Sequence, residues 1–141
     1  MKKIMVYSHD TYGLGNLRRM LSICQHLTAS IPNLTILLIS GSPMVHGFRL
    51  PRRVDYIKLP CLTRSQREEY AVKFLGLGII EAIRLRSDLI LAAATNFKPD
   101  LLLVDKKPFG VKNELEATLR YVKEKLPQTK KFWFSETYWT N

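Results

Sequence analysis

The stretch MVYSHDTYGLGNLRRM, residues Met5 to Met20, holds the pattern that decides the fold. The apolar run over Ile4 to Ser8 is typical of a strand that is buried on both faces of a parallel sheet. Two glycines separated by one residue follow this strand, and from Leu17 onward the apolar residues recur at helical spacing. The stretch therefore predicts a strand, a glycine turn and a helix in direct succession.

Strand and helix patterns alternate along the rest of the chain. Short apolar runs predict strands, and longer segments with apolar residues on one face predict helices. The polar segment at residues 63–78 predicts a loop with a short helix. Alternation of this kind is typical of a parallel sheet with helices on both faces, so we expect one Rossmann-like α/β domain. The further expected elements are strands at residues 34–40, 54–59, 101–105 and 130–134, and helices at residues 79–97 and 113–126.

The composition is typical of a globular protein. The chain has 141 residues, of which 46% are hydrophobic, enough for one domain with one core. It contains no apolar run of the ~18 residues that a membrane span needs, and the apolar run near its start is too short for a signal peptide. Cys24 and Cys61 lack metal-type spacing and are expected to be buried, reduced thiols. We therefore expect a cytoplasmic location.

The charge balance is strongly basic. The chain carries 22 Lys and Arg residues against 12 Asp and Glu residues, a net charge of +10. This excess predicts an anionic partner, which could be a nucleotide, an anionic membrane face or nucleic acid. The basic residues are scattered and are not interleaved with aromatic residues, a pattern that argues against specific recognition of nucleic acid.

Ligands of parallel α/β sheets bind at the carboxyl ends of the strands. The residues expected there are 9–15, 41–47 and 105–110. The first of these loops lacks the Lys-Ser/Thr pair of a phosphate loop and the third glycine of a dinucleotide-binding turn. It retains a flexible turn and a helix N-terminus that could meet an anion or a sugar oxygen. Arg18 and Arg19 oppose the helix dipole, which favours an anion nearby; in the alternative interpretation both side chains are simply solvated.

His9 and Asp10 directly follow the first predicted strand. A histidine held by an aspartate can titrate near neutral pH, and an acceptor hydroxyl would need a general base at this place. The alternative is structural: Asp10 shapes the turn, and His9 packs or hydrogen-bonds to the loop.

Four segments together resemble one protein family. They are YSHDTYGLGNLRRMLSICQHL, LLISGSPMVHGFRLPRRVDYIKLP, YAVKFLGLGIIEAIRLRSDLIL and FKPDLLLVDKKPFGVKNELEATLRYVKEKLP. In this order they resemble the amino-terminal half of a predicted bacterial glycosyltransferase family, related to the family 28 enzymes. The resemblance implies the two-domain GT-B architecture, in which the amino-terminal domain holds the acceptor and the carboxy-terminal domain holds the nucleotide-sugar donor. It implies no metal and no cofactor besides the donor as co-substrate, because helix N-termini and basic side chains take the diphosphate charge.

The resemblance also implies the site residues. The family motif after the first strand is Gly-x-Gly-His-x-x-Arg, in which Asn16 of this chain replaces the histidine. An amide cannot take up a proton near neutral pH, so Asn16 supplies at most hydrogen bonds, and it is also a good N-cap for the following helix. His9 and Asp10 match the family and are the candidates for catalysis. The candidates for binding substrate or phosphate are Gly13, Gly15, Asn16, Arg18, Arg19, His46, Asp105 and Lys106.

The resemblance ends near residue 130. We therefore expect a Rossmann-like acceptor domain over residues 1–130 and a divergent aromatic tail over residues 131–141. Because the donor domain is not part of this sequence, we expect the chain alone to transfer no sugar, either as a truncated product or as one half of a split enzyme. The implied partners are a small-molecule sugar acceptor, a donor-domain polypeptide and the inner face of a membrane. The alternative function is a non-enzymatic basic module that binds anionic lipid or a phosphorylated ligand.

Overall fold

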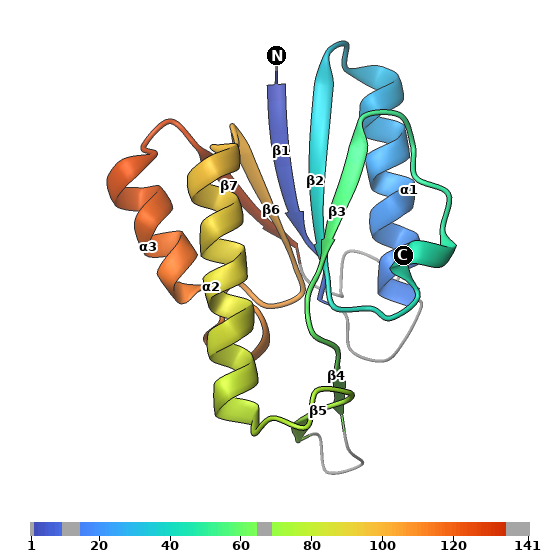
Figure 1. Ribbon diagram of the computed structural model, residues 1–141. Helices are drawn as coiled ribbons and strands as arrows, with labels where there is room; N and C mark the ends of the chain where they lie inside the picture. The colour runs from blue at the N-terminus through green and yellow to red at the C-terminus, as the bar shows by residue number, and fades with distance from the viewer. Residues whose placement is uncertain (1, 10–14, 65–68, 135–141) are drawn as a thin grey trace.

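Parallel strands form the central sheet of the protein. The computed structural model describes residues 2–9, 15–64 and 69–134 (Figure 1). Within these ranges the sheet has five strands in the order β3-β2-β1-β6-β7, and every neighbouring pair is parallel. The predicted Rossmann-like sheet is confirmed, because the chain adds strands on one side of β1 and then crosses to its other side. The strands are β1 (Lys2–Tyr7), β2 (Leu34–Ser40), β3 (Val54–Lys58), β6 (Leu101–Asp105) and β7 (Lys130–Phe134).

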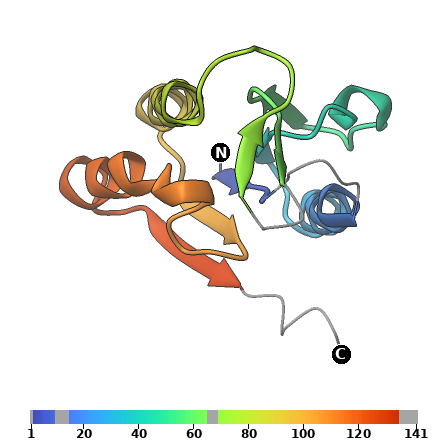
Figure 2. The same cartoon turned by 90° about the horizontal axis from the view of Figure 1, so that it is seen from below.

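Helices cover both faces of this sheet. α1 (Gly15–Ser30) lies on one face, and α2 (Ile79–Phe97) and α3 (Glu116–Lys125) lie on the other (Figures 1 and 2). Successive side chains of a strand point to opposite faces, so alternate residues of β1 enter two separate cores. The residues on the α1 side are Ile4 and Val6, and those on the side of α2 and α3 are Met5 and Tyr7. The strand with two buried faces and the two-sided helix layer are therefore confirmed.

The carboxyl ends of the central strands lie together. Tyr7 of β1 is in register with Ile39 of β2 and with Val104 of β6. Beyond the ladder, the Ser8 amide donates to the Ile39 carbonyl at 2.9 Å, which extends the pairing into the loop. The described residues that directly follow β1, β2 and β6 therefore lie at one edge of the sheet, the lower edge in Figure 1.

The segment at residues 63–78 differs from its prediction. β4 (Leu62–Arg64) and β5 (Tyr70–Val72) form an antiparallel pair, and the described residues of the segment contain no helix. Alternate side chains of the pair enter a small core with Ala82 and Val111 at the start of α2 and after β6. The prediction was wrong because three-residue strands hold too few apolar residues for their period of two to stand out among charges.

The other helices and strands begin and end close to the residues predicted from the sequence, with one exception. α2 and β6 have the predicted bounds, and Cys24 and Cys61 are buried and form no disulfide, as expected. α3 starts at Glu116 rather than at residue 113. Before it, a short 3-10 turn, η2 (Val111–Asn113), contains Lys112 and Asn113 with φ of 47° and 60°. Such left-handed residues do not continue an α-helix.

β7 forms one outer edge of the sheet. It pairs with β6 from Leu101↔Lys130 to Asp105↔Phe134, so the strand predicted at residues 130–134 is confirmed. This strand includes residues on both sides of the domain boundary expected at residue 130, and residues 135–141 lie outside the described ranges. None of the helices within the described ranges is long and apolar enough to cross a bilayer.

Candidate functional site

His9 lies at the centre of the sheet edge where the carboxyl ends of the strands meet. It follows β1, the middle strand, and its side chain is buried. Its Nε2 atom lies 3.3 Å from the hydroxyl oxygen of Tyr70 in β5, within hydrogen-bonding distance. Its Nδ1 atom is also buried and has no hydrogen-bond partner among the described residues. One ring nitrogen is thus held by the hairpin, and the other is buried without a hydrogen-bond partner among the described residues.

The surroundings of His9 keep its imidazole neutral. Burial, and to a smaller extent the positive charges of Lys106, Lys107, Arg64 and Arg86, together lower its pKa from the usual 6.5 to about 4. A neutral imidazole accepts a hydrogen bond at physiological pH, whereas an imidazolium cannot. The expectation that His9 titrates near neutral pH is wrong, because burial and the nearby cations make the imidazole a weaker base. The same basic side chains produce a positive potential that would stabilise an anion at this edge.

The start of α1 is tied directly to His9. The Asn16 side-chain amide donates to the His9 carbonyl oxygen at 2.6 Å, and the Arg19 guanidinium donates to the Asn16 side-chain oxygen. Asn16 is the second residue of α1, which begins at Gly15, so the expectation that it caps the helix from outside is wrong. Its amide connects the loop after β1 to Arg19 instead. The structure therefore brings His9, Asn16 and Arg19 together.

Arg18 and His46 lie away from this cluster. The Arg18 guanidinium lies 5.9 Å from the centroid of the Phe48 ring, on the side of α1 that faces the segment after β2. His46 is exposed on the short 3-10 turn η1 (Val45–Gly47) of that segment. Two other predicted site residues, Asp10 and Gly13, lie outside the described ranges.

Asp105 and Lys106 end the neighbouring strand, β6. Asp105 is buried at the last position of the strand. Lys106 follows with a φ of 70°, and its carbonyl oxygen accepts a hydrogen bond from the Trp133 indole nitrogen at 2.6 Å. The charge of Lys106 lowers the pKa of His9, so a predicted site residue at the end of β6 acts on the imidazole that follows β1.

A basic cavity of about 560 Å³ adjoins the His9–Tyr70 pair. Tyr70 lines the cavity and also contacts His9, so the hydroxyl of this side chain links the two. Three basic side chains and one carboxylate line the cavity: Arg64, Lys107, Lys112 and Glu69. The sequence pointed to the loop that holds Lys107 but not to Arg64, Tyr70 or Lys112. The antiparallel pairing of Arg64 with Tyr70 places the hairpin residues here, and the sequence analysis did not predict this pairing.

A buried ion pair lies close to His9, since the charge of its Arg86 acts on that imidazole. The Arg86 Nε atom lies 2.9 Å and 3.0 Å from the two carboxylate oxygens of Glu114, and both side chains are fully buried. Arg86 also donates to the Pro60 carbonyl oxygen at 2.7 Å. Desolvation raises the pKa of Glu114, and the charge of Arg86 opposes that rise. The pair joins α2, the loop before α3 and the connection after β3.

Sequence reasoning missed this pair, although a signal exists. Arg86 falls four residues from both Ala82 and Ile90 on the buried face of α2. A charged residue in an apolar stripe is an exception that needs a buried partner.

Comparisons with known proteins identify no relative, because no protein-family model and no curated protein matches the chain. In the part of the chain that the structure describes, no group of three or more His, Cys, Asp or Glu side chains is placed to hold a metal ion. The interpretation of the site therefore rests on its geometry and on the resemblance of the sequence motifs.

Proposed function

We propose that the chain is the acceptor-side domain of a glycosyltransferase that uses a nucleotide-sugar donor. The supporting observation is a neutral, buried histidine at the middle of the carboxyl edge of a Rossmann-like sheet, linked through Tyr70 to a basic cavity. Ligands of open α/β sheets bind at this edge. The motif resemblance to family 28-related enzymes names the reaction class that this edge would serve.

The proposed chemistry assigns a role to each group. The acceptor hydroxyl attacks the anomeric carbon of the donor, a carbon–oxygen bond forms, and the bond from that carbon to the donor phosphate breaks. The proton of the hydroxyl passes to the Tyr70 hydroxyl oxygen while the Tyr70 proton passes to the neutral imidazole of His9. Arg64, Lys107 and Lys112 hold an anionic group of the sugar acceptor in the cavity.

The donor in this proposal is bound outside the residues that the structure describes, which form only the acceptor side of the site. Transfer requires both reactants to be positioned and their developing charge to be stabilised, and one half of a cleft supplies little of either. The purified chain incubated with nucleotide sugars should therefore release no nucleoside diphosphate. Turnover by the chain alone would contradict this division of the reaction.

Ligand titrations test the acceptor site itself. We expect glycosyl phosphates to bind at least about tenfold more tightly than inorganic phosphate, with amide shifts at His9, Tyr70 and Lys107 in NMR spectra. His9→Asn should weaken this preference, and Arg52→Glu, an exposed change at the opposite end of the sheet, should not. Equal affinity for inorganic phosphate and every glycosyl phosphate would contradict a sugar-specific site.

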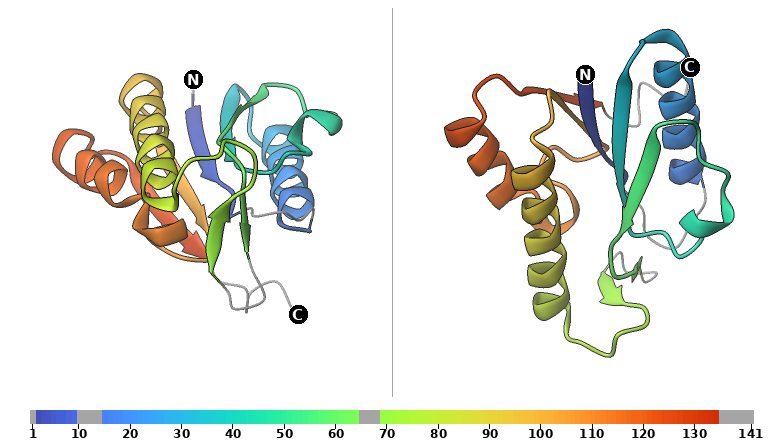
Figure 3. Two further views of the ribbon diagram at one scale, coloured as in Figure 1. Left: turned by 60° about the horizontal axis from the view of Figure 1, so that its bottom comes forward. Right: turned by 45° about the horizontal axis from the view of Figure 1, so that its top comes forward.

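A second candidate is a non-enzymatic module that binds an anionic lipid surface. The segment between β5 and α2 extends beyond the sheet together with the β4–β5 hairpin (Figures 1 and 3). It exposes large apolar side chains, with Phe74 65% and Ile80 74% exposed, and basic Lys73 and Arg84 flank them. Apolar side chains at a projecting tip with basic neighbours fit an anionic bilayer surface.

Vesicle binding distinguishes this candidate. We expect cosedimentation with vesicles of phosphatidylcholine mixed with phosphatidylglycerol, and much less with phosphatidylcholine alone. Phe74→Ser with Leu75→Ser should remove the binding, whereas Leu89→Ser, a change at an exposed residue further along α2, should leave it intact. Equal sedimentation of the two variants would exclude the segment as the contact.

A further inference from the structure

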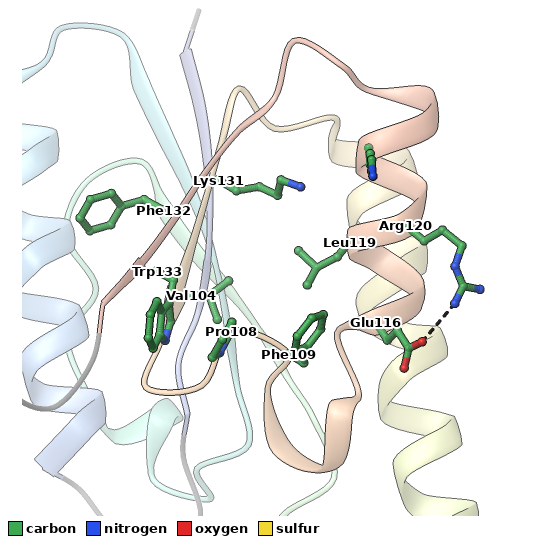
Figure 4. Close-up of a pocket in the computed structure, with 10 residues that line it drawn as sticks. Val104, Pro108, Phe109, Glu116, Leu119, Arg120, Lys131, Phe132 and Trp133 are labelled. Carbon is green, nitrogen blue, oxygen red and sulfur yellow. Dashed lines mark hydrogen bonds and ion pairs between the residues drawn. The ribbon is translucent and has the colours of Figure 1, made fainter.

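A groove of about 460 Å³ lies between α3 and the edge strand β7 (Figure 4). In Figure 4, Leu119 of α3 and Phe109 of the preceding loop face Val104 and Trp133 of the strands across this groove. Phe109 is 50% exposed and Trp133 is 48% exposed. Large aromatic side chains with this exposure, gathered in one groove, are typical of a contact surface for another molecule.

The aromatic wall of the groove is held in place. The Trp133 indole nitrogen donates to the Lys106 carbonyl oxygen at 2.6 Å, which fixes the ring against the end of β6. A side chain that is already ordered loses little conformational entropy when a partner covers it. Trp133 therefore has the properties of a binding anchor.

Basic side chains dominate the rim of the groove. Arg120, Lys123 and Lys131 line it, and Glu116 is the one acidic residue among the described side chains of its lining. The Glu116 carboxylate is paired with Arg120 at 3.1 Å, so Lys123 and Lys131 set the sign of the rim. A partner that covers the apolar wall would bring acidic side chains to these lysines, because like charges at the rim would cost affinity.

The fold favours a helix as the occupant. α3 lies on this face and leads into β7, and a right-handed crossover that continued outward would place the next helix beside α3 and over β7. The side of α3 toward the groove carries Glu116, Leu119, Arg120 and Lys123. Their spacing of three and four residues forms the ridge against which a second helix packs.

We infer that this groove binds an amphipathic α-helix of a second polypeptide, apolar toward Phe109, Leu119 and Trp133 and acidic along its flanks. The helix takes the position beside α3 that the next crossover helix of the sheet would occupy. Its side chains cover the exposed aromatic rings, and its carboxylates pair with Lys123 and Lys131. The inference is independent of sugar transfer, since it concerns a different part of the sheet from His9.

Two stapled peptides that are helical in solution test the inference. Both carry leucines on one face, and their flanks carry glutamates in one peptide and lysines in the other. We expect the glutamate peptide to bind the full chain at least about tenfold more tightly than the lysine peptide, less so at high salt. NMR shifts should be confined to α3, β7 and the loop at residues 106–110.

Charge reversal supplies the control. Lys123→Glu with Lys131→Glu should reverse the preference toward the lysine peptide, whereas Arg52→Glu with Arg84→Glu makes the same change in net charge at two other exposed positions and should not. In the chain that keeps Lys123 and Lys131, Phe109→Ser should weaken the binding of both peptides. The inference is overturned if neither peptide binds, if the shifts map elsewhere, or if the reversed rim keeps its preference. Self-association of the chain through Trp133 would equally overturn it, with a second copy as the occupant.

Discussion

Two groups of charge lie near the carboxyl edge of the sheet, and they differ in how deeply the protein buries them. The Arg86 guanidinium meets the Glu114 carboxylate at 2.9 Å inside the protein, so each charge has its opposite next to it. The four charged side chains that lower the pKa of His9 are all basic. The buried ion pair is balanced internally and holds the fold, and its Arg86 also acts on His9, whereas Arg64, Lys106 and Lys107 lie nearer the surface, where an anion from outside can reach them. Substitutions in the two groups should therefore have different consequences.

The largest effect is expected from Glu114→Gln. The substitution leaves the Arg86 guanidinium buried without its counter-charge, which should lower the free energy of unfolding by about 3–5 kcal/mol. Glu116→Gln is the matched control, because its ion pair with Arg120 is well exposed and should contribute less than about 0.5 kcal/mol. Urea unfolding of both variants measures the difference. Equal losses would show that the buried pair does not hold the fold.

Gly110→Ala is expected to be the next most damaging change. Gly110 has a φ of 74°, and a Cβ atom there would lie 2.9 Å from both Leu115 Cγ and the Tyr7 hydroxyl oxygen. Left-handed strain and overpacking together should cost about 2–4 kcal/mol. Gly76→Ala separates the two causes, because Gly76 has a φ of 67° but nothing within 4 Å of the added atom. Its loss in thermal unfolding should be about 1 kcal/mol; if the two losses are alike, contact with Tyr7 is irrelevant.

The lowered pKa of His9 should make the free energy of unfolding depend on pH. The pKa of His9 is about 4 in the folded protein, against the ordinary 6.5 of an unfolded chain. As pH falls from 6.5 toward 4, the unfolded chain takes up a proton that folded His9 refuses. Stability should therefore decrease over this window by up to about 3 kcal/mol and remain unaffected by His9 above it.

His9→Asn removes this dependence and serves as the comparison. The free energy of unfolding of the unmodified chain should fall more steeply between pH 6.5 and 4 than that of the variant. Parallel curves would mean that His9 titrates normally and that the cationic surroundings do not act on it.

The sequence predicted the sheet well because its central strands carry their own signal. Ile4 to Tyr7 and Leu101 to Val104 are continuous apolar runs, which can be satisfied only by burial on both faces, and the glycine turn separates strand from helix. The position of His9 follows from that topology alone. The hairpin with Arg64 and Tyr70 could not be predicted in the same way, since its pairing depends on contacts with Ala82 and Val111, which lie far away in the sequence.

The same reasoning explains why one prediction about Asn16 was wrong. Residue type alone favoured a cap, since asparagine satisfies free helix amides. The side chain instead bonds to the His9 carbonyl and to Arg19, because His9 lies next to the first turn of the helix. A helix boundary read from apolar spacing is uncertain by one or two residues, and a cap assignment depends on that boundary.

The smallest expected effect tests whether an exposed cation changes the pKa of His9 without contacting it. Lys107→Gln removes one of the basic side chains that lower the pKa of His9, without touching the buried imidazole. The pKa of His9 should rise by a few tenths of a unit, and more at low salt, because the cation is exposed and screened by solvent. NMR titration of the His9 ring measures it, and Lys123→Gln, an equal change of charge on α3, is the control. If both substitutions leave the pKa unchanged, Lys107 does not act on His9, and the lowered pKa must come from burial and the remaining cations.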